Sequence, residues 1–190
     1  MRKIIVSEFV TLDGVMEDPG GGDRTPHGGW SFKFGRSDDQ QKFKSDELSA
    51  SDALLLGRVT YQGFAAAWPT MPGTGAYGER MNSLPKYVVS TTLAAADWNN
   101  SRLIKQNVAE EIAKLKQQPG QDIIVFGSGQ LIATLMEHGL IDQYNLLVHP
   151  VVLGGGRRLF QDGCQADLKL VDTHRFENGI MALIYQSAGK

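Results

Sequence analysis

The sequence predicts an α/β fold in which a twisted, mostly parallel sheet ends in an antiparallel hairpin. Short apolar runs typical of buried strands alternate with segments whose apolar residues recur at helical spacing. The run 122–126 shows this most clearly, because it meets the turn Gly127-Ser128-Gly129 and helical spacing then resumes. Near the end of the chain, Asn178-Gly179 separates two extended runs, which is a strong hairpin signal. Alternating strands and helices favour parallel pairing, and the hairpin adds an antiparallel edge.

The first elements follow from local composition. Residues 3–12 are rich in β-branched and aromatic types and predict a first strand. Segment 17–35 is crowded with Gly, Pro and aromatic residues, and a loop of that length is more often functional than a plain connection. Ser37-Asp38-Asp39-Gln40 has the form of a capping box, so a helix is expected over about 38–50.

The middle of the chain continues the alternation. A short buried strand at 53–57 is expected to lead into a turn or helix that begins at Arg58. Three prolines and several glycines in segment 69–85 predict an exposed loop. Residues 86–90 read as the next strand.

A helix is expected over about 105–118, where Glu110 and Lys114 stand at the four-residue spacing of a helical ion pair. Pro119-Gly120 ends it. The strand 122–126 and its following helix come next, and Gly139 ends that helix. The remaining strands are expected at 141–150, 167–177 and 180–187.

Composition places the chain among single-domain proteins and excludes several classes. The 190 residues are 42% hydrophobic and 21% charged with no linker, so one domain over 1–190 is expected. A net charge of −2 with scattered Lys and Arg argues against a nucleic-acid partner. No apolar run approaches the roughly 18 residues of a membrane span, and no signal peptide is seen. With Cys164 as the one cysteine, a cytoplasmic protein is expected.

Two glycine-rich segments invite comparison with the dinucleotide-binding fingerprint, and neither satisfies it. Segment 73–78 has three glycines but follows Met71-Pro72 instead of a strand. The turn 127–129 follows a strand, but Ile132 stands at the third glycine position, and the next strand ends without an acid. No Gly-Lys-Ser/Thr loop occurs, and the four histidines lie far apart, so no metal site is expected. A true Rossmann fold is therefore disfavoured.

Groups that suit a phosphate follow three of the expected strands. For Arg58, Thr60 or Ser90-Thr91 taken alone, a role as a turn residue or helix cap is the better explanation, and for Ser128 a cap role explains the residue equally well. Together they predict one extended anionic ligand across the carboxyl ends of the strands. These residues are Gly57, Arg58 and Thr60, then Ser90 and Thr91, then Gly127, Ser128, Gly129 and Gln130.

An ordered set of short motifs resembles a known family. The set consists of Leu12-Asp13-Gly14, Gly57-Arg58-Val59-Thr60-Tyr61, Val89-Ser90-Thr91, Val125-Phe126-Gly127-Ser128-Gly129, Gly139-Leu140-Ile141-Asp142 and Pro150-Val151-Val152-Leu153-Gly154-Gly155-Gly156. It resembles the dihydrofolate-reductase-like reductases, and most of all the C-terminal reductase domain of the bifunctional riboflavin-biosynthesis deaminase-reductase and its stand-alone relatives. The match runs nearly the whole chain in order.

The resemblance implies a dihydrofolate-reductase-like three-layer fold with NADPH lying across the strand ends. By this resemblance Gly57, Arg58, Thr60, Ser90 and Thr91 hold the adenosine-phosphate half. Gly127, Ser128, Gly129 and Gln130 hold the pyrophosphate. The loop at Asp13 covers the nicotinamide and faces the substrate.

The expected function is therefore that of an NADPH-dependent oxidoreductase acting on a small molecule. The resemblance implies 5-amino-6-(5-phosphoribosylamino)uracil reductase activity, of the riboflavin-biosynthesis type, or reduction of a related small heterocycle or carbonyl. Dihydrofolate reductases resemble this pattern with a carboxylate on the first helix. Here the acids of the first helix, Asp38 and Asp39, stand at its start, where they can simply cap it, so folate reduction is less favoured.

The catalytic hypothesis falls on Asp13, as a proton donor or by orienting a substrate or water, with a plain turn residue as the alternative. A non-catalytic NADP(H)-binding or ligand-sensing protein stays open as the other function. The resemblance and the apolar region Tyr144 to Leu153 also lead us to expect a homodimer.

Overall fold

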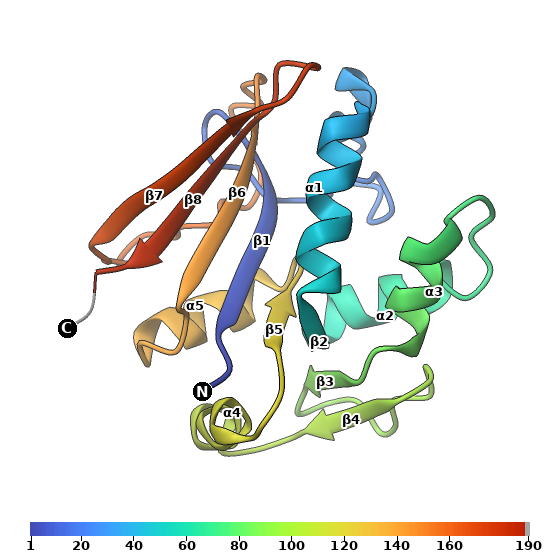
Figure 1. The fold of residues 1–190 in the computed structure, drawn as a ribbon, viewed down its shortest axis with the longest axis vertical. Coiled ribbons are helices and arrows are strands. Elements are labelled where there is room, and N and C mark those ends of the chain that lie inside the picture. The colour runs from blue at the N-terminus through green and yellow to red at the C-terminus, as the bar shows by residue number, and fades with distance from the viewer. Residues whose placement is uncertain (189–190) are drawn as a thin grey trace.

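Eight strands form a single sheet in the computed structural model, which describes residues 1–188 (Figure 1). The strand order is β4-β3-β2-β5-β1-β6-β8-β7. The strands are β1 (Ile4–Thr11), β2 (Ser51–Gly57), β3 (Lys86–Val89), β4 (Ser101–Ile104), β5 (Asp122–Val125), β6 (Gln143–His149), β7 (Leu168–Arg175) and β8 (Met181–Ser187). The helices are α1 (Asp38–Ser49), α2 (Arg58–Ala67), α3 (Gly75–Ser83), α4 (Val108–Gln117) and α5 (Gly129–Glu137), with a 3-10 turn at Trp30–Phe34.

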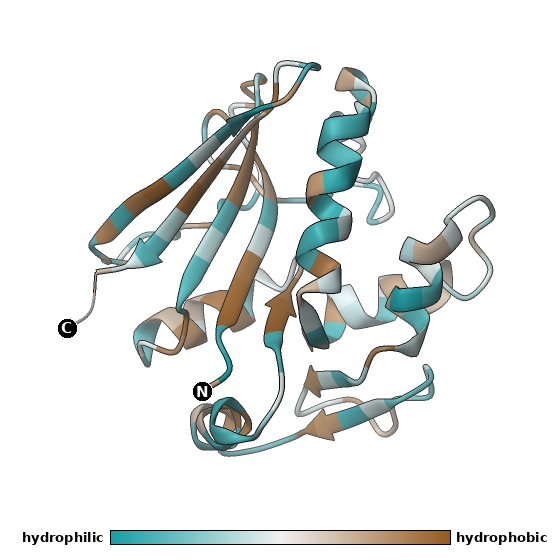
Figure 2. Ribbon diagram, viewed as in Figure 1, coloured by the Kyte–Doolittle hydropathy of each residue, from teal (hydrophilic) through white to brown (hydrophobic). Residues whose placement is uncertain are grey.

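Pairing between strands is parallel from β4 to β6, and β8 runs antiparallel to both of its neighbours. The predicted mostly parallel sheet with a C-terminal hairpin is thus confirmed. Helices α4 and α5 pack on one face, where Ile112 and Leu135 join the core beneath β1 and β5. Helices α1, α2 and α3 cover the other face, with Leu48, Tyr61 and Met81 buried there. Hydrophobic residues accordingly concentrate in the central strands, whereas the outward side of α1 is hydrophilic (Figure 2).

Two expectations about the middle of the chain were wrong. Segment 69–85, expected as an exposed loop, contains α3, and Met81 on that helix is fully buried. The prolines flank the helix instead of interrupting it, since all three lie outside Gly75–Ser83. Strand β4 was not expected at all, because four residues at the sheet edge carry too short a pattern.

Polar details at the helices also differ from expectation. Lys114 pairs with Glu111 at 2.8 Å, not with Glu110. Ser37 makes no side-chain cap bond to α1, so the capping box does not form. Asp39 instead accepts the N–H of Glu177 at 3.1 Å, which ties the start of α1 to the hairpin turn between β7 and β8.

The centre of the sheet opens at one place. Strand β1 pairs with β6 over residues 5–11, but it pairs with β5 only over residues 4–6. Beyond the Val6–Val125 pair, β5 ends and the chain turns into α5. We call the place where β1 and β5 separate the β1–β5 junction. Ligands of open α/β sheets bind where neighbouring strands diverge in this way.

Candidate functional site

Two helix starts lie side by side at the carboxyl ends of β2 and β5. These strands are neighbours in the sheet, and α2 begins at Arg58 while α5 begins at Gly129. The first turn of a helix has N–H groups without intrahelical partners and carries a partial positive charge. Two such turns together form a place that suits an extended anion such as a diphosphate.

Ser128 locks the two turns together. Its Oγ accepts the N–H of Gly57 at 2.8 Å and donates to the carbonyl of Phe126 at 2.9 Å. Its own N–H donates to Thr60 Oγ1 at 2.9 Å. Ser128 makes no side-chain cap bond to α5, so the cap alternative does not hold. Predicted site residues from both turns are brought into direct contact, and we call residues 57–60 with 127–130 the phosphate cradle.

Glycine is required in the cradle for steric reasons. Gly127 has a φ of 54°, and a Cβ there would lie 2.6 Å from Thr60 Oγ1. A Cβ on Gly129 would lie 3.0 Å from Met16 Sδ and 3.7 Å from Arg157 Cδ. The first turn of α5 therefore lies against two residues that belong to the loops on the far side of the junction.

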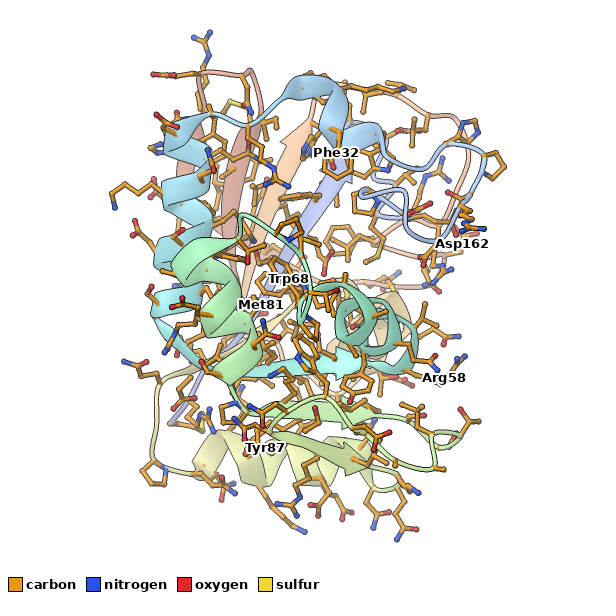
Figure 3. The ribbon with its side chains drawn as sticks, turned by 90° about the vertical axis from the view of Figure 1, so that its right-hand side faces the viewer. Phe32, Arg58, Trp68, Met81, Tyr87 and Asp162 are labelled. Atoms are coloured by element: carbon orange, nitrogen blue, oxygen red, sulfur yellow. The ribbon has the colours of Figure 1, made fainter. Side chains whose placement is uncertain are left out.

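The remaining predicted phosphate ligands are Arg58 and Gln130 within the cradle and Ser90 and Thr91 after β3. Arg58 is exposed at the outer edge of α2, and its Nη1 donates to Gln62 Oε1 at 3.0 Å (Figure 3). Ser90 is buried, and its Oγ accepts the N–H groups of Thr92 and Leu93 at 3.2 and 3.0 Å, which is the turn alternative. Thr91 and Gln130 are exposed. Arg58, Thr91 and Gln130 are thus the exposed side chains of this set, which a ligand can reach.

Asp13 is a carboxylate that ties two loops together. Its Oδ1 accepts the Thr11 hydroxyl at 2.6 Å and the Leu153 N–H at 3.2 Å, and its Oδ2 accepts the Gly154 N–H at 2.9 Å. The Thr11 hydroxyl above all, with the two N–H donors, lowers the pKa of Asp13 to about 2. A group of that pKa is ionised at neutral pH, so the geometry does not favour Asp13 as a proton donor.

Segment 17–35, which we call the covering loop, is held by its own side chains. Burial would raise the pKa of Asp18, but the N–H groups of Asp23 and Thr25 and the Thr25 hydroxyl lower it. Trp30 is fully buried and donates its Nε1–H to the Glu17 carbonyl at 2.8 Å. Glu17 also pairs with Arg157 at 3.2 Å. The loop is therefore an ordered cover next to the start of α5.

A buried polar network on the α1 face was missed by sequence reasoning. Lys44 Nζ lies 2.7 Å from Glu47 Oε2 and 4.6 Å from the centroid of the Phe126 ring, at the end of β5. Ser7 donates to Glu47 Oε2 at 2.9 Å, and Asn145 donates to Glu47 Oε1 at 2.6 Å. Burial acts to lower the pKa of Lys44, but the Glu47 carboxylate holds it above its ordinary value. The helical spacing of Lys44, Glu47 and the buried Leu48 was the available signal.

Glu8 was also missed by sequence reasoning. It lies in β1 at the junction and is 4% exposed, and its Oε1 has no hydrogen-bond partner among residues 1–188. Burial raises the pKa of Glu8 well above its ordinary value, while Lys44 and the Gly127 N–H act in the opposite direction. A charged residue within the otherwise apolar run of β1 was the signal.

Residues 1–188 contain no group of three or more His, Cys, Asp or Glu residues that could hold a metal ion. None of the helices there combines the length and the apolar character that crossing a membrane requires.

Comparison with known proteins gives consistent matches along the whole chain. The family profile described as "RibD C-terminal domain" matches residues 2–182. The uncharacterized protein YyaP of Bacillus subtilis (strain 168) is 35% identical over 192 residues, which cover 99% of this chain and 96% of YyaP.

Two solved structures share the fold at low sequence identity. A putative riboflavin biosynthesis protein from Shewanella sp. PV-4 has a TM-score of 0.76 at 19% identity, covering 97% of this chain and 98% of that one. Dihydrofolate reductase from Enterococcus faecalis, complexed with NADP(H) and RAB-propyl, has a TM-score of 0.59 at 15% identity, covering 97% and 94%. At such identities the likeness establishes the dihydrofolate-reductase-like fold alone.

Proposed function

The chain belongs to the RibD C-terminal domain family, and from this premise we propose that it is an NADPH-dependent reductase of a small heterocycle. Membership of this family supports a reductase-type role. The substrate class that the family resemblance implies is 5-amino-6-(5-phosphoribosylamino)uracil or a related heterocycle or carbonyl compound.

The observation that carries the proposal is the phosphate cradle. Two helix starts are fixed against each other by Ser128, and Gly127 leaves no room for a side chain. The N–H groups at the starts of α2 and α5 fit the diphosphate of a dinucleotide. Arg58 and Thr91 lie exposed on the β2 and β3 side, where they suit the 2′-phosphate that distinguishes NADPH from NADH. The complex of dihydrofolate reductase with NADP(H) agrees with a nicotinamide cofactor in this fold.

When bound, the cofactor supplies the hydride. The residues of the chain have three tasks. The cradle fixes the diphosphate, and the covering loop with the Asp13-bound loop at 153–154 excludes water from the junction. The Lys44–Glu47 network on the α1 face holds a buried ammonium and a carboxylate beside Phe126 at the end of β5. Such a pair orients a polar heterocycle whose edge both donates and accepts hydrogen bonds.

A non-catalytic NADP(H)-binding protein is the second candidate. Its support is that the bonds from Thr11, Leu153 and Gly154 lower the pKa of Asp13 to about 2, which does not favour this carboxylate as a proton donor. Folate reduction also needs testing: Asp39 binds the hairpin turn, whereas Glu47 is a buried acid on the first helix.

The two candidates are separated by one experiment. NADPH and NADH are titrated into the protein by calorimetry, and NADPH should bind more tightly. The protein with NADPH is then mixed with the proposed uracil derivative, dihydrofolate, other pterins and simple carbonyl compounds, and the absorbance of the reduced nicotinamide is followed. Its decay with one of these identifies a reductase. Tight binding without decay would favour the non-catalytic candidate, and absence of binding would end both.

We also propose a homodimer, although most of the expected region has another role. Tyr144, Leu146 and Leu147 are buried within the chain, whereas Val152 is 64% exposed. Leu12 and Phe160 are exposed near it at 68% and 40%. An apolar surface of this kind favours association with a second copy.

A further inference from the structure

Glu8 occupies a position that the fold itself does not explain. Side chains alternate along a strand, so Glu8 lies on the same face of β1 as Val6 and Val10, which pack in the core beneath α5. Its neighbour Ser7 points to the opposite face and bonds to Glu47 of α1. Glu8 therefore stands within an apolar face, where a hydrophobic residue would satisfy the fold.

One oxygen of its carboxyl group is left without a partner in the described part of the chain. Oε1 is buried and has no hydrogen-bond partner in residues 1–188. The nearest cation, Lys44, is engaged by Glu47 at 2.7 Å and by Ser7 at 2.5 Å. Buried polar atoms in native proteins have partners with few exceptions, so an orphaned oxygen points to a group that the chain does not supply.

The junction locates that group. Glu8 lies two residues beyond Val6, the last residue of β1 that pairs with β5, and its β5 side is therefore bordered by the Gly127 turn. Gly127 belongs to the phosphate cradle, and its N–H acts on the Glu8 carboxyl. If Arg58 and Thr91 hold the adenosine half of a dinucleotide, as in the proposed function, that half would lie toward β2 and β3. The nicotinamide half would then leave the cradle in the other direction, toward β1 and Glu8.

The chemistry of that site matches a carboxamide on a flat ring. Val6 and Val10 flank Glu8 on the same face of β1 and are buried in the core, and Met16 packs against the nearby start of α5. A single buried acceptor among apolar groups suits a ring that carries one amide donor.

We propose that Glu8 Oε1 accepts a hydrogen bond from the carboxamide NH2 of the nicotinamide ring and so sets the orientation of that ring at the junction. This inference rests on the proposed function. Glu8 is in this sense a positioning residue for the hydride-donating ring. A carboxylate, a carboxylic acid and a glutamine amide all present an acceptor oxygen at this place, so the bond itself does not require a particular protonation state.

The test uses three ligands and two variants of the full chain, measured by calorimetric titration. NADPH carries the complete carboxamide on its nicotinamide ring. Its 3-acetylpyridine analogue keeps the carbonyl of that group but lacks the NH2, and 2′-phospho-ADP-ribose lacks the nicotinamide ring. Glu8→Leu should weaken NADPH about tenfold, the equivalent of one hydrogen bond. The same variant should leave the affinities of the other two ligands unchanged. Glu8→Gln, which retains an acceptor, should bind NADPH within about threefold of the unaltered protein.

Each other outcome overturns the proposal. Equal NADPH affinity in Glu8→Leu would mean that Oε1 makes no bond to the ring. Equal weakening of 2′-phospho-ADP-ribose would mean that Glu8 shapes the cradle instead. Equal weakening of the acetylpyridine analogue would assign the contact to a group other than the NH2. If the unaltered protein binds 2′-phospho-ADP-ribose as tightly as NADPH, the nicotinamide ring adds no affinity and this inference fails alone. If the unaltered protein binds none of the ligands, the proposed function fails with it.

A stability measurement guards against a folding defect. Because Glu8→Leu removes an unsatisfied buried carboxyl group, the ligand-free variant should unfold at the same temperature as the unaltered protein or above it. A lower unfolding temperature would show that the carboxyl supports the fold and would overturn the proposal. The expected pattern is a residue that costs stability in the free protein and adds affinity for the cofactor.

Discussion

The two sides of the β1–β5 junction are held by different kinds of interaction. On the cradle side, neutral hydrogen bonds between a hydroxyl and backbone groups join Gly57, Thr60 and Ser128, and Gly127 leaves no free space. On the covering side, carboxylates hold the loops: Asp13 binds two backbone N–H groups, and Glu17 pairs with Arg157. The difference suggests that the cradle is rigid and insensitive to pH, whereas the cover depends on charges that acid or salt can weaken.

The largest expected effect is a steric break of the cradle. Gly127→Ala forces a side chain into a positive φ and against Thr60 Oγ1, so the free energy of unfolding should fall by about 2–4 kcal/mol. Gly154→Ala on the covering side is the matched control, since its φ is also positive at 74° but nothing lies within 4 Å of the added Cβ. That variant should lose only about 1 kcal/mol.

Urea denaturation of both variants, with an NADPH titration of each, makes this comparison. Gly127→Ala should also lose most of its affinity for NADPH. Equal losses of stability in the two variants would show that the cradle is no more tightly packed than the cover.

A second, smaller effect concerns pH. Because the pKa of Asp13 is lowered to about 2 in the folded chain, this group adds stability above the ordinary aspartate pKa near 4. That contribution is lost as the pH falls from about 4 through about 2. Asp13→Asn should therefore be less stable than the unaltered protein at pH 7, and the difference should shrink toward pH 2.

Denaturation at pH 7, 4 and 2 measures this difference. Asp162→Asn, at an exposed carboxyl outside the two segments that Asp13 joins, serves as the control and should change the free energy of unfolding less at pH 7 (Figure 3). A gap between Asp13→Asn and the unaltered protein that stays constant with pH would mean that Asp13 contributes through its shape and not its charge.

The smallest effect belongs to the exposed pair of Glu17 and Arg157. A double-mutant cycle with Glu17→Gln and Arg157→Gln should give a coupling energy below about 1 kcal/mol, and less at high salt. A salt-independent coupling above that value would show that the covering loop is held as firmly as the cradle, and would remove the contrast between the two sides.

Much of the fold follows from local pattern, and much of the site does not. The strands at both sides of the junction are visible as apolar runs, and the hairpin is visible from Asn178-Gly179. Residues 57–60 and 127–130 could be chosen because glycine and hydroxyl residues after strands suit anions. Ser128 bonds to Gly57 instead of capping its own helix because β2 and β5 are neighbours in the sheet. A local sequence pattern does not show which strands are neighbours.

Buried charges were the hardest to foresee. Lys86 begins the strand expected at 86–90, yet it is fully buried and donates to the carbonyls of Asn82, Leu84 and Asn99 at 2.8–3.0 Å. Glu8 and Lys44 are buried in a similar way. The sequence pattern marks these two residues as unusual, but their environments are made by elements distant in sequence, which composition and periodicity do not reveal.

The bond between Gly57 and Ser128 joins residues 71 positions apart, and it bears on the kinetics of folding. Strands β3, β4 and β5 and helices α2 to α4 lie between these two residues, and the bond closes them into one loop. Contacts of such long range form late, because the intervening chain must first be ordered. A cofactor bound at the cradle would then stabilise the native state after the rate-limiting step. It would lengthen the lifetime of the folded protein by slowing unfolding, with little effect on the folding rate.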